Sequence, residues 1–283
     1  MKRIILRTSA LIAIVTAIVI GANYLGIAAG QAISVKGSDT MVLLGQRWAE
    51  AFMKQNPGIV VQVTGGGSGV GIAALINGST DVCEASRPMK ASEVDKLKER
   101  FNSPGVEIPV ARDGLSVYLN DQNPISELSI DQLAAIYSGK ATNWKEFGGN
   151  DARIILYGRE NSSGTYGLFK DEVLKGRDFA PQTQTLPGTA AVVNAVSKDP
   201  NGIGYGGAAY AKGVKDAKLK LDAKSTAYLP TEENVKSGVY PLSRYLFWYL
   251  RNKPMGDTKK LVDFVLSEEG QKIVAEVGYY GLK

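Results

Sequence analysis

Hydrophobic residues follow two alternating patterns along most of the chain. Short apolar runs, typical of buried strands, are separated by longer stretches whose apolar positions recur at helical spacing. The strands are predicted over residues 33–36, 59–63, 81–85, 154–157, 202–205 and 240–250. The helices are predicted over residues 43–52, 72–76, 130–137, 165–174, 190–197 and 259–277. This alternation indicates an α/β fold with mostly parallel strands.

A long extended stretch over residues 106–120 interrupts the alternation and is long enough to cross between two lobes. We predict a first lobe formed by residues 33–110 and 215–283, and a second lobe formed by residues 111–214. A chain that leaves one lobe, builds the other and returns makes two crossings. Ligands of open α/β sheets bind at the carboxyl ends of strands, so a cleft between the lobes is the expected binding site.

The first 32 residues have the layout of a secretory signal. Lys2, Arg3 and Arg7 precede a run over residues 8–29 that contains no charged residue, and small residues follow it. We therefore predict that residues 1–32 are a signal peptide and that the mature chain begins at Ile33. About 20 apolar residues can also span a bilayer, so an uncleaved membrane anchor is the alternative. Either interpretation predicts an exported protein, in the periplasm or at the cell surface.

The positive net charge of the chain depends largely on this leader. The whole sequence has 33 basic and 28 acidic side chains, but residues 1–32 hold three of the basic ones and no acidic one. The mature chain therefore carries 30 basic against 28 acidic side chains and is close to neutral. No basic stretch alternates with aromatic residues either, which argues against a nucleic-acid partner. The single cysteine, Cys83, cannot form an internal disulfide.

Three predicted strands run into turns rich in glycine and hydroxyl residues, each of which opens a helix. These turns cover residues 37–41, 65–70 and 159–166. Free backbone N–H groups at a helix start form an anion site, glycine allows close approach, and arginine matches the geometry of an oxyanion. Taken singly, each turn is explained as well by ordinary helix capping, and Arg159 by a surface ion pair. Their repetition after three strands favours an anion site.

Four segments also resemble the substrate-binding proteins of phosphate ABC transporters. They read GSDTM (37–41), GGGSGVG (65–71), TDVCEASRPM (80–89) and RENSSGTYGLF (159–169), and the resemblance extends over essentially the whole mature chain. The Arg-x-x-x-Ser-Gly-Thr motif is the most specific part. The resemblance implies a type II periplasmic-binding-protein fold, inorganic phosphate held between two lobes, and ABC transporter membrane subunits as partners. It also implies a monomer and no cofactor.

The resemblance assigns phosphate contacts to specific positions of this chain. The implied ligands are Thr40, the amide of Met41, Ser68, Arg159, Ser163, Gly164 and Thr165, with Ser38 and Gly69 as neighbours. Where some members of the family have an aspartate that accepts a proton from phosphate, this chain has Arg87, which follows Ser86, and we count both among the predicted phosphate-binding residues. We therefore expect another proton acceptor, and our hypothesis is Asp39. An equally good interpretation is that Asp39 only caps its helix.

Two other classes of function remain to be compared with phosphate binding. The sequence has no histidine, so it cannot build a Ser-His-Asp or Cys-His arrangement or a histidine-based metal site, and no paired carboxylates stand out in the turns. We therefore predict that the protein is not an enzyme and binds no metal. The alternative within the same fold is a binding protein for molybdate, tungstate or sulfate, or a membrane-tethered anion sensor.

Overall fold

The computed structural model describes residues 32–282. Residues 1–31 of the predicted leader lie outside the described residues, so both its cleavage and its role as an anchor stay predictions. Within residues 32–282, the structure contains no helix with the length and apolar character needed to cross a bilayer.

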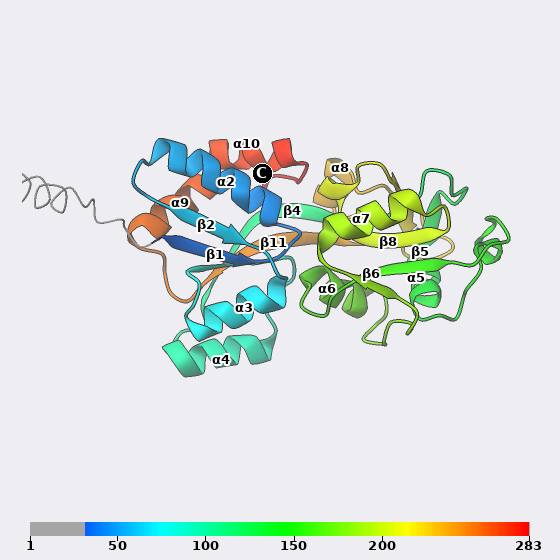
Figure 1. The fold of residues 1–283 in the computed structure, drawn as a ribbon, viewed down its shortest axis with the longest axis horizontal. Coiled ribbons are helices and arrows are strands. Elements are labelled where there is room, and N and C mark those ends of the chain that lie inside the picture. Colours follow the sequence, from blue (N-terminus) through cyan, green and yellow to red (C-terminus); the bar gives the residue numbers. More distant parts are fainter. Residues whose placement is uncertain (1–31, 283) are drawn as a thin grey trace, which may run out of the picture.

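One mixed sheet runs through the whole molecule and is shared by two lobes (Figure 1). The strands follow one another across it in the order β2-β1-β3-β11-β4-β8-β6-β7. Pairs near the two ends, such as β1 with β2 and β6 with β8, are parallel, while β11 and β4 in the middle run antiparallel to their neighbours. The strands are β1 (Ile33–Gly37), β2 (Val61–Thr64), β3 (Val82–Ala85), β4 (Val106–Leu119), β6 (Ile155–Arg159), β7 (Gln184–Leu186), β8 (Gly202–Gly207) and β11 (Ser243–Leu250).

Strand β4 carries the chain from one lobe to the other. Its first part, up to Gly114, pairs with β11, and its second part, from Leu115, pairs with β8. The return crossing lies where β11 begins, because Ser243 is the partner of Gly114 in the register. Two neighbouring antiparallel strands therefore connect the lobes, as the long extended stretch in the sequence indicated.

Helices cover both faces of the sheet in each lobe (Figure 1). In the first lobe, α2 (Val42–Gln55), α9 (Gly256–Leu266) and α10 (Glu268–Val277) share one hydrophobic cluster, and α3 (Ser68–Asn77) and α4 (Ala91–Phe101) belong to another. In the second lobe, α5 (Ile130–Tyr137) and α6 (Gly164–Glu172) share a cluster, and α7 (Gly188–Lys198) packs in a separate one. The two largest clusters lie one in each lobe, so each lobe has its own core.

The structure corrects two predictions. The helix predicted over residues 259–277 is two helices, because Ser267 has extended backbone and its hydroxyl accepts a hydrogen bond from the N–H of Gly270, which starts α10. Residues 215–242 were assigned to the first lobe but pack on the second. Strand β9 (Lys215–Asp216) pairs with β4, β10 (Lys218–Lys220) pairs with β5 (Glu127–Ser129), and Tyr240 and Leu242 lie in the second lobe's core.

Candidate functional site

The first predicted anion loop, between β1 and α2, meets the second lobe through a hydroxyl. The side chain of Thr40 is buried, and its Oγ1 lies 2.9 Å from Oγ1 of Thr165 at the start of α6. The preceding Ser38 is buried too and donates its N–H to the carbonyl of Glu84 on β3. Met41 anchors the loop because its side chain lies in the first lobe's core, while its N–H donates to the carbonyl of Ser38.

The glycine-rich loop between β2 and α3 approaches the second lobe with its backbone. Gly67 has φ +97°, a conformation that favours glycine, and a Cβ there would lie 2.5 Å from the carbonyl oxygen of Ser162. The N–H of Gly69 donates to the same carbonyl at 2.8 Å. Ser68 begins α3, and its Oγ accepts the N–H of Ser86 and lies 3.4 Å from Ser86 Oγ. The glycines therefore allow two backbones to touch across the lobes.

The third loop ends at the N-terminus of helix α6. Ser163 caps this helix, since its Oγ accepts the N–H of Tyr166. The N–H groups of Gly164 and Thr165 belong to the first turn and have no partner within the helix. A Cβ on Gly164 would overlap Ser68 Oγ and lie 2.7 Å from Ser86 Oγ, so this helix end faces two hydroxyls of the first lobe. The positive end of the α6 dipole adds to the attraction for an anion there.

Arg159 and Asp39 form an ion pair that joins the lobes. The Nη2 atom of Arg159 lies 3.0 Å from Oδ2 of Asp39, and its Nη1 donates to Oγ1 of Thr189 at 2.8 Å. The other carboxylate oxygen of Asp39 accepts the N–H of Gly66. Helix α2 has no side-chain cap, so the interpretation of Asp39 as a helix cap is wrong. Its role as a proton acceptor stays a prediction.

Arg87, the position that departs from the family pattern, is held by a carboxylate of its own lobe. Its two terminal nitrogens lie 2.8 and 2.7 Å from the two carboxylate oxygens of Glu93 on α4. Burial favours a lower pKa for Arg87, but the hydrogen bonds and charge of Glu93 raise it above its ordinary value. The aliphatic part of Arg87 lies close to Gly167 of α6. Glu93 therefore neutralises the charge that Arg87 brings toward the interface.

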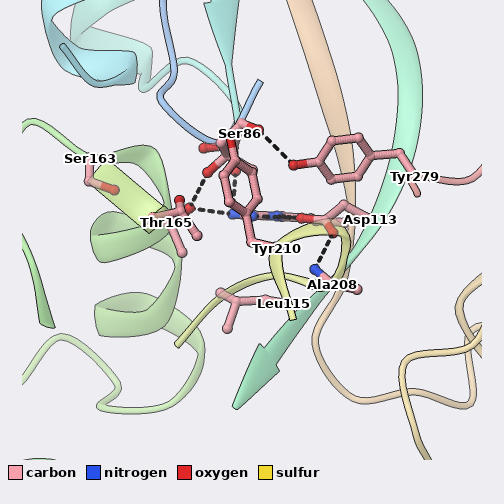
Figure 2. Close-up of polar contacts among 12 residues, drawn as sticks. Ser86, Asp113, Leu115, Ser163, Thr165, Ala208, Tyr210 and Tyr279 are labelled. Atoms are coloured by element: carbon pink, nitrogen blue, oxygen red, sulfur yellow. Dashed lines mark hydrogen bonds and ion pairs between the residues drawn. The ribbon is translucent and has the colours of Figure 1, made fainter. Parts of the chain in front are cut away.

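The structure adds a second buried ion pair that the sequence reasoning missed. Arg244 on β11 and Asp113 on β4 are register partners, with Nε and Nη2 of the arginine 2.8 and 2.7 Å from Oδ2 of the aspartate. Burial raises the pKa of Asp113, while Arg244 and the N–H of Ala208 oppose the rise. Nη1 of Arg244 reaches Oγ1 of Thr165 at 3.0 Å and the carbonyl of Ser86 at 3.1 Å. Figure 2 shows Ser86, Thr165 and Asp113 gathered at this point.

Two tyrosines that the sequence did not predict as site residues donate hydrogen bonds to the backbone of the first loop. Tyr279 donates its hydroxyl to the carbonyl of Thr40 at 2.6 Å, and Tyr210 donates to the carbonyl of Asp39 at 3.0 Å (Figure 2). Burial, with the Asp39 charge as a lesser cause, raises the pKa of Tyr210 to about 12, so its hydroxyl stays a donor near neutral pH. No local motif marks either residue, because tyrosine is common in this chain.

The interface between the lobes has little net charge but many hydrogen-bond donors. The buried guanidinium of Arg244 is matched by Asp113, and that of Arg159 by Asp39 and Glu160. Apart from these ion pairs, the polar groups at the interface include four hydroxyls from four separate loops and the backbone N–H groups in the first turn of α6. Each of these groups can donate a hydrogen bond in a fixed direction. The hydroxyls belong to Thr40, Ser68, Ser86 and Thr165. Directed donors of this kind, in a buried place, recognise an acceptor-rich anion without a large net charge.

Comparison with known proteins identifies the family of this chain. The model of the PBP superfamily domain matches residues 26–269. The phosphate-binding protein PstS of Pseudomonas aeruginosa is 34% identical over 267 residues, which cover 88% of this chain and 83% of that protein. The chain belongs to the PstS family of the PBP superfamily. The phosphate-binding protein PstS of Staphylococcus haemolyticus is also 34% identical, over 254 residues covering 86% of this chain and 79% of its own.

Solved structures of PstS-like proteins share the fold. A protein from Clostridium perfringens, described as a phosphate ABC transporter substrate-binding protein with bound phosphate, superposes with a TM-score of 0.81 at 31% identity, over 89% of this chain and all of its own. An ABC-type phosphate transport receptor from Vibrio cholerae gives 0.71 at 30% identity, over 88% of this chain and 99% of its own. The predicted family and the predicted type II periplasmic-binding-protein fold are thereby confirmed.

Proposed function

We propose that this protein is an extracytoplasmic solute-binding protein that captures inorganic phosphate between its two lobes and delivers it to an ABC transporter. One observation carries the proposal. Hydroxyls from four loops, three in the first lobe and one at the start of α6, converge with the first-turn amides of Gly164 and Thr165, which have no partner within the helix. The names of the PstS relatives and the phosphate-bound neighbour support the choice of phosphate as the ligand.

The arrangement suits an anion that exchanges its hydrating water for hydrogen-bond donors fixed in the protein. Removing water from a multiply charged anion is costly, so many directed hydrogen bonds must replace its hydration. Because both guanidiniums already have carboxylate partners, the hydroxyls and helix amides supply most of the new contacts. We assign direct contact with phosphate to Thr40, Ser68, Ser86, Gly164 and Thr165. Contacts from Ser38, Met41, Gly69, Ser163 and Arg159 stay predictions of the family resemblance, and those from Asp39 and Arg87 stay predictions from the sequence.

The binding cycle that we propose is a hinge motion. The first lobe would comprise residues 33–113 and 243–283, and the second lobe residues 114–242, which places both crossings at the β4 and β11 pair. Opening would separate the Thr40 and Thr165 hydroxyls and expose the donors to water, and closure around phosphate would bury it. The closed form, as a monomer, would be recognised by the membrane subunits of the transporter. No chemical step is needed, and the relatives are named as binding proteins.

Isothermal titration calorimetry of the purified protein tests this function. Phosphate should bind tightly, and sulfate, molybdate and tungstate weakly or not at all. The Ser68→Ala variant should lose about 10-fold in phosphate affinity, since one donor of the set is removed. Ser197→Ala is the matched control, because this hydroxyl lies on α7 and bonds to the carbonyl of Asn194 on the same helix. Tight binding of another oxyanion in place of phosphate would keep the fold and refute the ligand.

A further inference from the structure

Arg244 occupies a position from which it contacts both lobes at once. It lies on the return crossing strand, next to Ser243, where the chain re-enters the first lobe. Its Nη1 donates to the carbonyl of Ser86 in the first lobe and to the hydroxyl of Thr165 in the second. These two contacts use groups that belong to loops of the candidate site.

Asp113 fixes the orientation of this guanidinium. The two residues are directly opposite each other on antiparallel strands, and Oδ2 of Asp113 lies close to both Nε and Nη2 of Arg244. The other oxygen, Oδ1, accepts the N–H of Ala208 at 3.1 Å, so the carboxylate is held as well. With one edge of the guanidinium tied to the hinge strand, Nη1 is the nitrogen left to face the loops.

The contact with Thr165 determines how that hydroxyl can act. A guanidinium only donates hydrogen bonds, while a hydroxyl has one proton and two acceptor lone pairs. At 3.0 Å, Nη1 of Arg244 occupies a lone pair of Thr165 Oγ1. The single proton of Thr165 therefore points away from Arg244, and Thr40 Oγ1 lies 2.9 Å from the hydroxyl on the side facing the first lobe. A hydroxyl set in this way donates to whatever acceptor lies there.

We propose that Arg244, held by Asp113, is a positioning residue that fixes the Thr165 hydroxyl as a hydrogen-bond donor to the bound anion. This inference rests on the proposed function, because the acceptor is the phosphate of that site. It explains why a second arginine lies beside a set of neutral hydroxyls although its charge is already matched. It also makes the orientation of a donor in the second lobe depend on the hinge strands.

A double-mutant cycle measured by calorimetry with inorganic phosphate tests the positioning role. Arg244→Gln should raise the Kd about 10- to 100-fold when Thr165 is present, the range expected for losing a charge-assisted hydrogen bond. In the Thr165→Val background, which has no hydroxyl to orient, the same change should raise the Kd at most about 2-fold. Thr165→Ser, which keeps the hydroxyl, should restore most of the dependence on Arg244.

Controls separate positioning from loss of charge and loss of fold. Arg251→Gln removes an arginine just beyond the far end of β11, where it pairs with Asp81, and should leave the Kd unchanged. If Arg244→Gln does not fold, Arg244→Lys takes its place in the cycle, since one ammonium group cannot reproduce the contacts with Asp113, Ser86 and Thr165 together.

The outcomes are distinguishable. Equal losses in the Thr165 and Thr165→Val backgrounds, or no loss in either, would overturn the positioning role while phosphate binding itself stands. Absence of phosphate binding by the unmodified protein would instead refute the proposed function, and the positioning role with it. A loss confined to the backgrounds that carry a hydroxyl at position 165, from threonine or from serine, supports the proposal.

Discussion

The two buried arginines of the interface, Arg159 and Arg244, are held in different ways. Arg159 pairs across the lobes with Asp39, whose side chain is 21% exposed, whereas Arg244 pairs within the hinge with Asp113, which is 0% exposed. In the proposed opening of the lobes, the first pair separates and its carboxylate is rehydrated. The second pair stays together, because both of its residues belong to the two strands that form the crossing.

This difference divides the interface into a part that changes and a part that does not. The pair of Arg159 and Asp39 acts between loops, together with the contacts of Gly69 and Gly164, and each of these requires closure. In the proposed hinge motion, the pair of Arg244 and Asp113 stays fixed while the lobes move relative to it. The first pair is exposed only at Asp39, and its buried guanidinium has Glu160 as a second carboxylate partner, so loss of Asp39 leaves the charge of Arg159 compensated. Among the described residues Arg244 has Asp113 alone, so breaking that buried pair leaves an uncompensated charge.

The largest effect is expected when the hinge pair is broken. Asp113→Ala leaves the Arg244 guanidinium buried without its carboxylate and should lower the free energy of unfolding by about 3–5 kcal/mol. Asp39→Ala is the matched control for the loop pair and should cost about 1 kcal/mol or less, because the Asp39 carboxylate reaches solvent and Arg159 keeps the carboxylate of Glu160, 3.3 Å from its Nε, as a partner. Urea unfolding followed by circular dichroism measures both. Equal losses in the two variants would contradict the distinction between the pairs.

Closure can be blocked without touching the hinge. Gly164→Ala places a methyl group against Ser68 and Ser86, and overpacking of this kind costs about 1–3 kcal/mol, which would weaken phosphate binding about 10- to 100-fold. The stability of each lobe should change little, since the lobes can open to relieve the overlap. Gly167→Ala, one turn along the same helix, is the control, because its Cβ would meet only ordinary contacts with Arg87. Calorimetry and thermal unfolding report the two quantities.

The buried carboxyl of Glu84 has a tryptophan as its partner in place of a cation, which contrasts with the two ion pairs. It lies against Gly45 and accepts a hydrogen bond from Trp248. Burial raises its pKa from 4.5 to about 8, and the Trp248 bond only partly opposes this. Above pH 4.5 the unfolded chain loses this proton while the folded protein keeps it. The contribution of this bound proton to the free energy of unfolding is therefore complete below pH 4.5 and is lost as the pH rises from about 4.5 to about 8.

Glu84→Gln removes this titration and keeps the shape of the side chain. We expect the variant to be more stable than the unmodified protein at pH ~8, by about 2–4 kcal/mol, with little difference at pH ~4.5. Urea unfolding at a series of pH values measures the change. Parallel pH profiles for the two proteins would show that Glu84 does not carry the proton.

The smallest effect concerns the carboxylate of the loop pair and the choice of anion. If Asp39 accepts a proton from bound phosphate, Asp39→Asn should reduce the preference for phosphate over sulfate about 10-fold, the equivalent of one charge-assisted hydrogen bond. Competition calorimetry with the two anions measures this ratio. An unchanged ratio would assign Asp39 only to its contacts with Arg159 and the N–H of Gly66.

Local signals in the sequence determined much of this molecule. The periods of hydrophobic residues placed the main helices and strands, since a helix or strand must bury one face. The glycine and hydroxyl turns marked the loops that meet at the interface, because the conformations and donors required there are properties of single residues. The break at Ser267 was also readable, as a serine followed by Glu268 and Glu269 is a helix start.

Only the tertiary structure decided which residues face each other across long separations. Arg244 and Asp113 are 131 residues apart and carry no motif, so their pairing depends on the register of β4 and β11. The direction of Arg87 was decided by Glu93, and the lobe of residues 215–242 by strand pairing. Propensity and spacing act within a few residues, whereas ion pairs and lobe boundaries follow from how distant segments pack. The sequence therefore indicated the anion-binding chemistry of the loops, but it did not indicate the Arg244 and Asp113 pair on the hinge strands.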